Sequence, residues 1–414
     1  MGSSKLNSHL DDPLLFRRER PIIVIGITNA QTCLLLRGRL RALRESGFRV
    51  VLISSPGPLL NEMGEHEGVE IVAIPMQRGV TPLRDLVALF RLCIVLLRLR
   101  PDISEFSTPK AGILGSLAGL ACGVPHRIYL LRGLRLETAS GPLRWILRFT
   151  EGVASACCHL VLCNSKSIRD QAKVLHLAVE RKLVLLGHGT SNGVDVERFR
   201  PGSSRVKSML GIPANAPVIG FVGRLTRDKG IPELIEAFDA LLKTAPQARL
   251  LLVGWYDDSE DALSSKLRVR IDRHSQIVRT GLVADTAPYY RAMDMLVLPT
   301  WREGFPNVVL EAAASCIPVI TTLATGSCDS VLPEVTGLLI PPGHPEAITE
   351  AMLQLLGDPT RRKKMGIAAR AWVTKRFRHT QVQGLTVRLY SDLLKNGCEH
   401  WPGVPVRGAA AVAD

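Results

Sequence analysis

The sequence predicts an α/β protein of two doubly wound domains, each a parallel sheet covered by helices, that face one another across a central cleft. The chain has 414 residues, 46% of them hydrophobic, which is too long for one ordinary core. Unbroken apolar runs, typical of strands buried on both faces, alternate with segments of helical spacing. This alternation restarts after a turn-rich stretch at 211–217. We therefore expect two tandem domains whose ligands bind at the carboxyl ends of the strands.

The first domain is expected at 21–200, after a mobile leader at 1–20. A strand at 22–27, a helix at 32–46 that ends at Gly47, and a strand at 49–54 form a β-α-β unit. The alternation continues through segments at 69–74, 83–100, 111–122, 127–131, 143–155, 160–163, 167–175 and 182–186.

The second domain is expected at 201–378. Its strands are predicted at 217–222, 249–253, 276–279, 295–299, 318–321 and 338–341. Its helices are predicted at 232–242, 261–271, 287–293, 307–315, 345–356 and 360–376. A last helix at 379–397 is expected to return to the first domain, and 398–414 is expected to be a mobile tail.

Composition excludes several classes of protein. The formal net charge is +14, and most of the excess lies in residues 1–200, so the first domain should meet something anionic. Nine cysteines without C-x-x-C pairs indicate reduced thiols in a cytosol and no structural metal. No apolar signal segment opens the chain, and Asp85, Arg91 and Arg98 interrupt its most apolar stretch. Nucleic acid is disfavoured because only 5% of residues are aromatic and no binding module is recognisable.

The segment from Glu303 to Glu311 carries the sharpest chemical signal. Glu303 follows the strand predicted at 295–299, and Gly304 lets a ligand approach the backbone. The segment continues with Phe305, Pro306, Asn307 and Val308. Pro306 suits a helix start, where free amides favour an anion such as pyrophosphate. Glu311 lies about one turn further and can accept hydrogen bonds from vicinal hydroxyls. The alternative is that Glu303 is a solvated loop acid and Glu311 pairs with an arginine.

A second candidate is the loop from Gly223 to Gly230, directly after the first strand of the second domain. Arg224 and Lys229 place two cations where a diphosphate could lie. The alternative is a solvated basic loop. No G-x-x-x-x-G-K-[ST] or G-x-G-x-x-G pattern occurs there, which disfavours triphosphate hydrolysis and dinucleotide redox chemistry.

Together with Asn192-Gly193-Val194-Asp195, these two segments resemble the family-4 glycosyltransferases of GT-B fold over about residues 21–395. The strings Arg100-Pro101-Asp102-Ile103, Thr108-Pro109-Lys110-Ala111-Gly112 and Leu131 to Thr138 look like those of bacterial enzymes that build capsule, O-antigen or exopolysaccharide on lipid carriers.

The resemblance implies a retaining glycosyltransferase that moves a hexose or N-acetylhexosamine from a nucleotide-diphosphate sugar, UDP above all, to a lipid-linked glycan. Glu303 would contact the donor sugar, 304–308 would wrap sugar and phosphate, and Glu311 would hold the ribose. Arg224 and Lys229 would neutralise the leaving diphosphate, so that neither a metal nor another cofactor is needed. The absence of any Asp-x-Asp agrees with this.

Two positions depart from the family pattern. Many relatives have a histidine where this chain has Arg132, and an arginine cannot act as a general base. Arg132 is therefore expected to act as a cation or donor toward sugar or phosphate, unless it forms an ion pair with Glu137 or Glu151. The loop of Thr28 and Asn29 lacks the paired glycines of relatives, and we assign Thr28, Asn29 and Lys110 to the acceptor.

Arg84, Arg91 and Arg98 recur every seven residues and thus share one helix face. This stripe is either a solvated polar face or a patch that attracts the protein to the inner surface of the cell membrane, where a peripheral cytoplasmic enzyme would meet its lipid-linked acceptor. Two rival functions remain at this point: a sugar-nucleotide epimerase of similar architecture, and a non-catalytic protein that binds a sugar nucleotide or phospholipid.

Overall fold

The first domain is built on one seven-stranded sheet. The computed structural model describes residues 20–77, 79 and 81–397, so the expected tail and nearly all of the expected leader lie outside the described residues. The strands run in the order β3-β2-β1-β4-β5-β6-β7, all parallel. They are β1 (Ile22–Gly26), β2 (Arg49–Ser54), β3 (Glu70–Ala73), β4 (Ile103–Ser107), β5 (His126–Leu131), β6 (Leu160–Cys163) and β7 (Leu183–Leu185). The strand order reverses between β1 and β4, which makes the carboxyl ends of these two strands the expected ligand edge.

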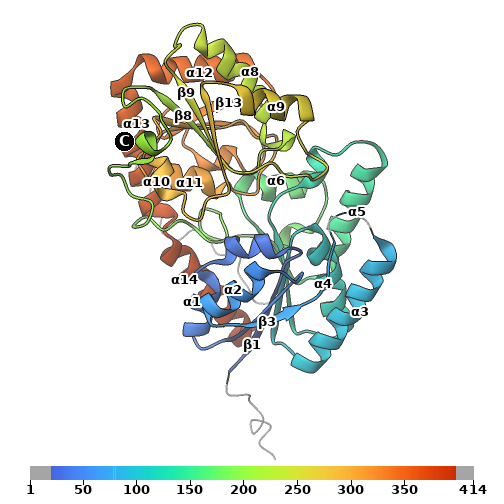
Figure 1. The fold of residues 1–414 in the computed structure, drawn as a ribbon. Coiled ribbons are helices and arrows are strands. Elements are labelled where there is room, and N and C mark those ends of the chain that lie inside the picture. The colour runs from blue at the N-terminus through green and yellow to red at the C-terminus, as the bar shows by residue number, and fades with distance from the viewer. Residues whose placement is uncertain (1–19, 78, 80, 398–414) are drawn as a thin grey trace, which may run out of the picture.

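Helices cover both faces of this sheet, as its apolar strands require. They are η1 (Ala30–Leu36), α1 (Arg39–Glu45), α2 (Pro58–Glu67), α3 (Pro82–Leu99), α4 (Pro109–Ala121), η2 (Arg135–Glu137), α5 (Gly141–Cys157), α6 (Lys166–Val174) and η3 (Glu180–Lys182). Figure 1 shows α3, α4 and α5 together on one side of this domain.

The second domain repeats the plan with six strands. Their order is β10-β9-β8-β11-β12-β13, again all parallel. The strands are β8 (Val218–Val222), β9 (Arg249–Val253), β10 (Ile277–Gly281), β11 (Met295–Leu298), β12 (Val319–Thr322) and β13 (Gly337–Ile340). The helical segments are α7 (Val206–Met209), η4 (Arg227–Lys229), α8 (Ile231–Leu242), α9 (Ser265–Arg273), α10 (Ala287–Tyr290), α11 (Asn307–Ala314), η5 (Cys328–Ser330), α12 (Pro345–Gly357) and α13 (Pro359–Arg376). Here the order reverses between β8 and β11.

The chain crosses between the domains twice, at adjacent points. On the way out, Val194 N donates to Phe377 O (2.8 Å), and on the way back His379 N donates to Val194 O (2.9 Å). The last helix, α14 (His379–Asn396), then packs on the first domain beside α1 (Figure 1), where Leu389 and Leu393 are fully buried in its core. The two crossovers that connect the domains are thus hydrogen-bonded to each other.

One local expectation was wrong, and two elements were missed. The helix expected at 32–46 is divided into η1 and α1, because Gly38 adopts the left-handed region (φ 77°) and its N–H donates to the buried Glu67 carboxylate (2.9 Å). Strand β4 and helix α2 were not predicted. Strand β4 lies at the centre of the sheet although it contains Glu105, which is fully buried in an ion pair with Arg39.

Candidate active site

Two loops of the second domain meet where its strand order reverses. The loop after β8 contains Gly223 to Gly230, and the loop after β11 leads to α11. A Cβ on Gly230 would lie 2.0 Å from Pro299 O, and Gly230 has φ 72°, so only glycine allows this approach. The carbonyl of Asp228 accepts from Trp301 N (2.9 Å) and from Thr300 Oγ1 (3.1 Å). The two candidate segments are therefore packed against each other and hydrogen-bonded.

This packing brings Lys229 and Glu303 together. Lys229 Nζ donates to Glu303 Oε1 at 2.5 Å, and each side chain is 16% exposed. A charge-assisted bond of this length between partly buried groups is strong and directional. The structure thus places a cation and a carboxylate side by side at the ligand edge of the sheet, rather than as separate solvated loop residues.

Arg224 lies in the same loop and is held by acidic neighbours. Its Nη1 donates to Asp257 Oδ2 (2.7 Å), and Nη2 lies 3.7 Å from Asp228 Oδ2. Burial would lower the pKa of Arg224, but Asp257 and Asp228 hold it above its usual value. Each predicted diphosphate-binding cation therefore has a carboxylate partner, and an incoming diphosphate would have to share these guanidinium and ammonium groups.

Arg302 was missed by the sequence analysis. Its Nη2 lies 2.9 Å from Asp261 Oδ2 and 3.3 Å from the buried Asp228 Oδ2. Burial alone would raise the pKa of Asp228, but Lys229, Thr226 and Arg302 lower it. Arg302 is therefore a third cation beside Glu303, and its only sequence signal was its position one residue before that glutamate.

Helix α11 begins beside this cluster. Pro306 is its N-cap and Asn307 its first residue, so the free amides of Asn307 and Val308 lie at the predicted helix start. The Phe305 side chain is buried and packs on Phe377 with ring centroids 5.2 Å apart. Phe305 therefore anchors the loop in the core, and only its main chain remains available to a donor.

Glu311 does not pair with an arginine. Its Oε2 accepts from the hydroxyl of Tyr290 on α10 (2.7 Å). Burial raises the pKa of Glu311, and the hydrogen bond from Tyr290 opposes that rise. The carboxylate is therefore oriented by Tyr290, and its role toward a ribose stays a prediction.

Loops of the first domain contact the Glu303 loop from the opposite side. A Cβ on Gly304 would lie 1.7 Å from Arg132 O, and one on Gly133 would lie 3.4 Å from Gly304 N. Further along this contact, Thr325 Oγ1 donates to Glu137 (2.7 Å), and Ser167 N donates to Asp329 (2.8 Å). These contacts hold the loop after β5 directly against the Glu303 loop.

Arg132 forms neither of the ion pairs considered for it. Its Nε donates to Ser107 Oγ (3.1 Å) and its Nη1 to Ser191 Oγ (2.7 Å), while the buried Nη2 has no hydrogen-bond partner among the described residues. Burial and the nearby Arg39 lower the pKa of Arg132 to about 10. Both of these side-chain hydrogen bonds lie within the first domain, and it is the main chain of Arg132 that approaches Gly304 of the Glu303 loop.

The residues assigned to the acceptor have structural partners. Thr28 is buried and its Oγ1 lies 2.7 Å from Thr108 Oγ1, which ties β1 to the start of α4. Asn29 caps η1 by accepting from Gln31 N (2.7 Å). Lys110 Nζ donates to Asp85 Oδ1 (2.6 Å). Each of the three side chains thus has a partner within the protein. That they bind an acceptor stays a prediction.

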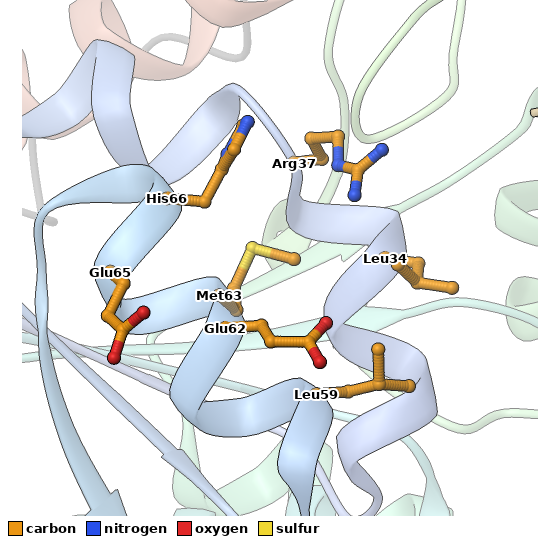
Figure 2. Close-up of a pocket in the computed structure, with 7 residues that line it drawn as sticks. All are labelled: Leu34, Arg37, Leu59, Glu62, Met63, Glu65 and His66. Atoms are coloured by element: carbon orange, nitrogen blue, oxygen red, sulfur yellow. The ribbon is translucent and has the colours of Figure 1, made fainter. Parts of the chain in front are cut away.

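A hollow near these residues has a different lining. It lies between η1 and α2, has a volume of about 480 Å³, and combines apolar, basic and acidic side chains (Figure 2). Its lining residues are Leu34, Arg37, Leu59, Glu62, Met63, Glu65 and His66. The linker residue Asn192 donates to Arg37 O (3.0 Å), so the hollow adjoins the crossover between the domains.

Among the described residues, no group of three or more His, Cys, Asp or Glu side chains has an arrangement that would hold a metal ion. No helix within the described part of the chain is long and apolar enough to cross a membrane.

Two facing parallel-sheet domains, with the candidate site where their loops meet, have the architecture of the GT-B fold. Residues 36–189 match the family described as glycosyl transferase 4-like domain, and residues 216–358 match glycosyl transferases group 1. The chain belongs to this glycosyltransferase family, as the resemblance predicted.

Individual relatives agree with this assignment. The capsular polysaccharide biosynthesis glycosyltransferase CapM of Staphylococcus aureus is 32% identical over 370 residues, which cover 89% of this chain and 96% of CapM. An Escherichia coli UDP-Gal:alpha-D-GlcNAc-diphosphoundecaprenol alpha-1,3-galactosyltransferase is 25% identical over 84% of this chain and 87% of its own length. The crystal structure of Anabaena HepE in complex with UDP has the same fold, with a TM-score of 0.73, 20% identity, and coverage of 90% of this chain and 100% of HepE.

Proposed function

We propose that this glycosyltransferase is a retaining, metal-independent enzyme that moves a hexose or N-acetylhexosamine from a UDP-sugar to a lipid-linked glycan. Its product would enter surface polysaccharide synthesis. The proposal is supported above all by the 2.5 Å bond between Lys229 and Glu303 at the reversal of strand order. This bond brings together a cation suited to a phosphate and a carboxylate suited to sugar hydroxyls.

The reaction breaks the bond between the anomeric carbon and the diphosphate oxygen, and negative charge develops on the departing diphosphate. We assign the stabilisation of that charge to Lys229 and Arg224, together with the main-chain amides at the start of α11. Glu303 would accept hydrogen bonds from the sugar hydroxyls while it keeps Lys229 in place. Arg132 would position the Glu303 loop through its carbonyl contact with Gly304.

The relatives support the substrate classes. The name of the Escherichia coli relative states a UDP-sugar donor and a diphosphoundecaprenol-linked acceptor, and the Anabaena structures are complexes with UDP and with UDP-glucose. The S. aureus relative is named for capsular polysaccharide biosynthesis. We extend these classes to the present chain, with the enzyme acting at the cytoplasmic face of the membrane.

The test is to incubate the enzyme with a panel of UDP- and GDP-sugars and a polyprenyl-diphosphate-linked acceptor. Mass spectrometry of the products identifies the sugar transferred, and the ¹H NMR coupling constant of the new linkage identifies its anomeric configuration. We expect transfer from a UDP-sugar with the donor's configuration. Inverted product would refute retention, epimerised donor without transfer would favour an epimerase, and tight donor binding without turnover would favour a binding protein.

A further inference from the structure

The outer surfaces of α3 and α5 expose large apolar side chains. Leu83, Phe90, Trp145 and Phe149 are 83%, 67%, 70% and 71% exposed. We call this surface the α3–α5 face, made of Leu83, Leu86, Val87, Phe90, Leu97, Trp145, Ile146 and Phe149. Exposed apolar groups that gather in this way mark a contact with a protein or a membrane.

Helix α3 is apolar on two sides. Its inner side buries Ala88, Leu92 and Leu96 in the core, which accounts for the attachment of the helix to the sheet. Its outer side repeats Leu83, Leu86 and Phe90 at intervals of three and four residues, all exposed. A surface helix that served only the fold would be polar on that side. The outer apolar residues therefore need another explanation.

The exposed residues of the two helices belong to one side of the molecule. Helix α4 packs against both α3 and α5, and the three helices lie together on the same side of the first domain (Figure 1). Leu120 on α4 is itself 49% exposed. Helix α4 therefore lies between the two helices that carry the α3–α5 face.

The charges around this face are basic. Arg84, Arg91 and Arg98 form no ion pair within the described chain and are exposed beside the apolar residues of α3, and Arg144 and Arg148 lie on α5. The carboxylates of these helices are not displayed: Asp85 bonds to Lys110 (2.6 Å), and Glu151 is buried with Tyr129 (2.6 Å). Apolar and aromatic residues with a basic rim complement an anionic lipid surface. The same basic rim would repel a second copy of itself.

The topology orients this face with respect to the candidate site. In a parallel sheet each helix begins at the carboxyl edge of the strand before it, which is the edge that carries the site. Phe90 on α3 and Trp145 on α5 lie in the first half of their helices, and Phe149 lies at the middle of α5. The apolar surface therefore extends toward the edge of the sheet at which the candidate site lies.

We propose that the α3–α5 face docks on an anionic lipid bilayer, with its apolar side chains inserted at the interface and its arginines at the lipid phosphates. Docking in this way turns the carboxyl edge of the first sheet, at which the candidate site lies, toward the membrane surface. The suggestion that this position serves a lipid-linked acceptor rests on the proposed function, whereas the docking itself does not.

The test measures partition of the full chain onto vesicles of 30% phosphatidylglycerol in phosphatidylcholine. In the triple variant Phe90→Ser, Trp145→Ser and Phe149→Ser, every charge is kept, and we expect binding to fall at least about tenfold at both low and high salt. The matched control, Met209→Ser with Leu282→Ser, removes side chains of the second domain that are 75% and 72% exposed, and it should bind as the wild type does.

The arginines are tested separately. Arg84→Gln, Arg91→Gln and Arg98→Gln together should weaken binding at low salt and have little effect at high salt, because salt screens exposed charges. Circular dichroism and thermal unfolding establish that each variant is folded. Unchanged binding of the folded triple apolar variant would overturn the proposal. The proposal would also be overturned if sedimentation equilibrium showed a dimeric wild type and a monomeric triple apolar variant, and this variant still bound vesicles as the wild type does.

A second readout separates docking from catalysis. Transfer to a water-soluble acceptor should be the same in the wild type and the triple apolar variant, because the changed residues do not touch the Lys229–Glu303 site. A wild type that binds vesicles through this face but transfers no sugar would refute the proposed function and leave the docking proposal in place.

Discussion

Replacing Gly304 by alanine tests whether the enzyme works with its two domains in contact as they are here. The new Cβ would lie 1.7 Å from Arg132 O and 2.6 Å from the carbonyl carbon. Such contacts normally exceed about 3.0 Å, so the two loops would have to separate by about 1.3 Å or more. Both obstructing atoms belong to the main chain, so no side-chain rotation relieves the clash. Gly304 is also not among the positive-φ glycines, so alanine adds no backbone strain.

The displacement sets the expected magnitude. A misplacement of about 1 Å in a catalytic constellation costs about 10²-fold in rate. We therefore expect kcat/KM of Gly304→Ala to fall about 10²-fold, measured as initial rates of sugar transfer. The melting temperature should change little, because the clash lies between the domains and leaves both cores intact. Gly384→Ala on α14, where a Cβ meets nothing within 4 Å, is the matched control and should transfer sugar at the wild-type rate.

Wild-type kinetics for Gly304→Ala would refute the reasoning, because they would mean that catalysis does not need the contact between the Arg132 and Glu303 loops. A large loss of thermal stability would refute it in another way, because the contact would then serve the fold rather than the positioning of the site.

The remaining predictions concern the two glutamates, metal and pH. Glu303→Gln should lower kcat by about 10²-fold or more, whereas Glu311→Gln should mainly raise the donor KM, in steady-state kinetics; an exchange of the two effects would reverse the placement of sugar and ribose. Transfer should persist in excess EDTA, and a strict Mg²⁺ or Mn²⁺ requirement would contradict the assigned diphosphate site. Burial raises the pKa of Glu151 from 4.5 to about 7, so the folded state holds a proton that the unfolded chain loses between these pH values, and stability from this group is lost as pH rises toward 7. Glutamine mimics the protonated acid. The free energy of unfolding of Glu151→Gln, measured with denaturant, should therefore rise by about 3 kcal/mol relative to that of the wild type between pH 4.5 and 7. If the difference between the two free energies did not change with pH, Glu151 would not titrate in this range.

Much of the fold could be predicted because most strands are continuous apolar runs between turn signals. Strand β4 was not predicted because Glu105 interrupts its apolar pattern. The partners that stabilise the buried Glu105 carboxylate are Arg39 and Tyr390, which are 66 and 285 residues away in the sequence. The division of the helix at Gly38 likewise depends on Glu67, which lies in a helix that was itself not predicted. Long-range pairing of charged groups is not visible in local periodicity.

The site shows the same limit. The positions of Lys229 and Glu303 at strand ends follow from the alternation of elements, and the structure joins them although 74 residues separate them. The sequence could not reveal that Phe305 faces the core, that Lys110 is bound to Asp85, or that Arg302 joins the cluster. Phe305 and Arg302 lie in a loop, which has no period from which the direction of a side chain could be predicted. Lys110 lies in the first turn of α4, and its partner Asp85 belongs to another helix 25 residues away.

The central claim is that Lys229 at the Glu303 site stabilises the departing diphosphate. The most direct measurement is the donor kcat/KM of Lys229→Met in sugar transfer, beside Lys266→Met, which removes an exposed lysine of α9. We predict a fall of about 10²-fold or more for Lys229→Met and no change for Lys266→Met. An unchanged kcat/KM in folded Lys229→Met would contradict the assignment of this site.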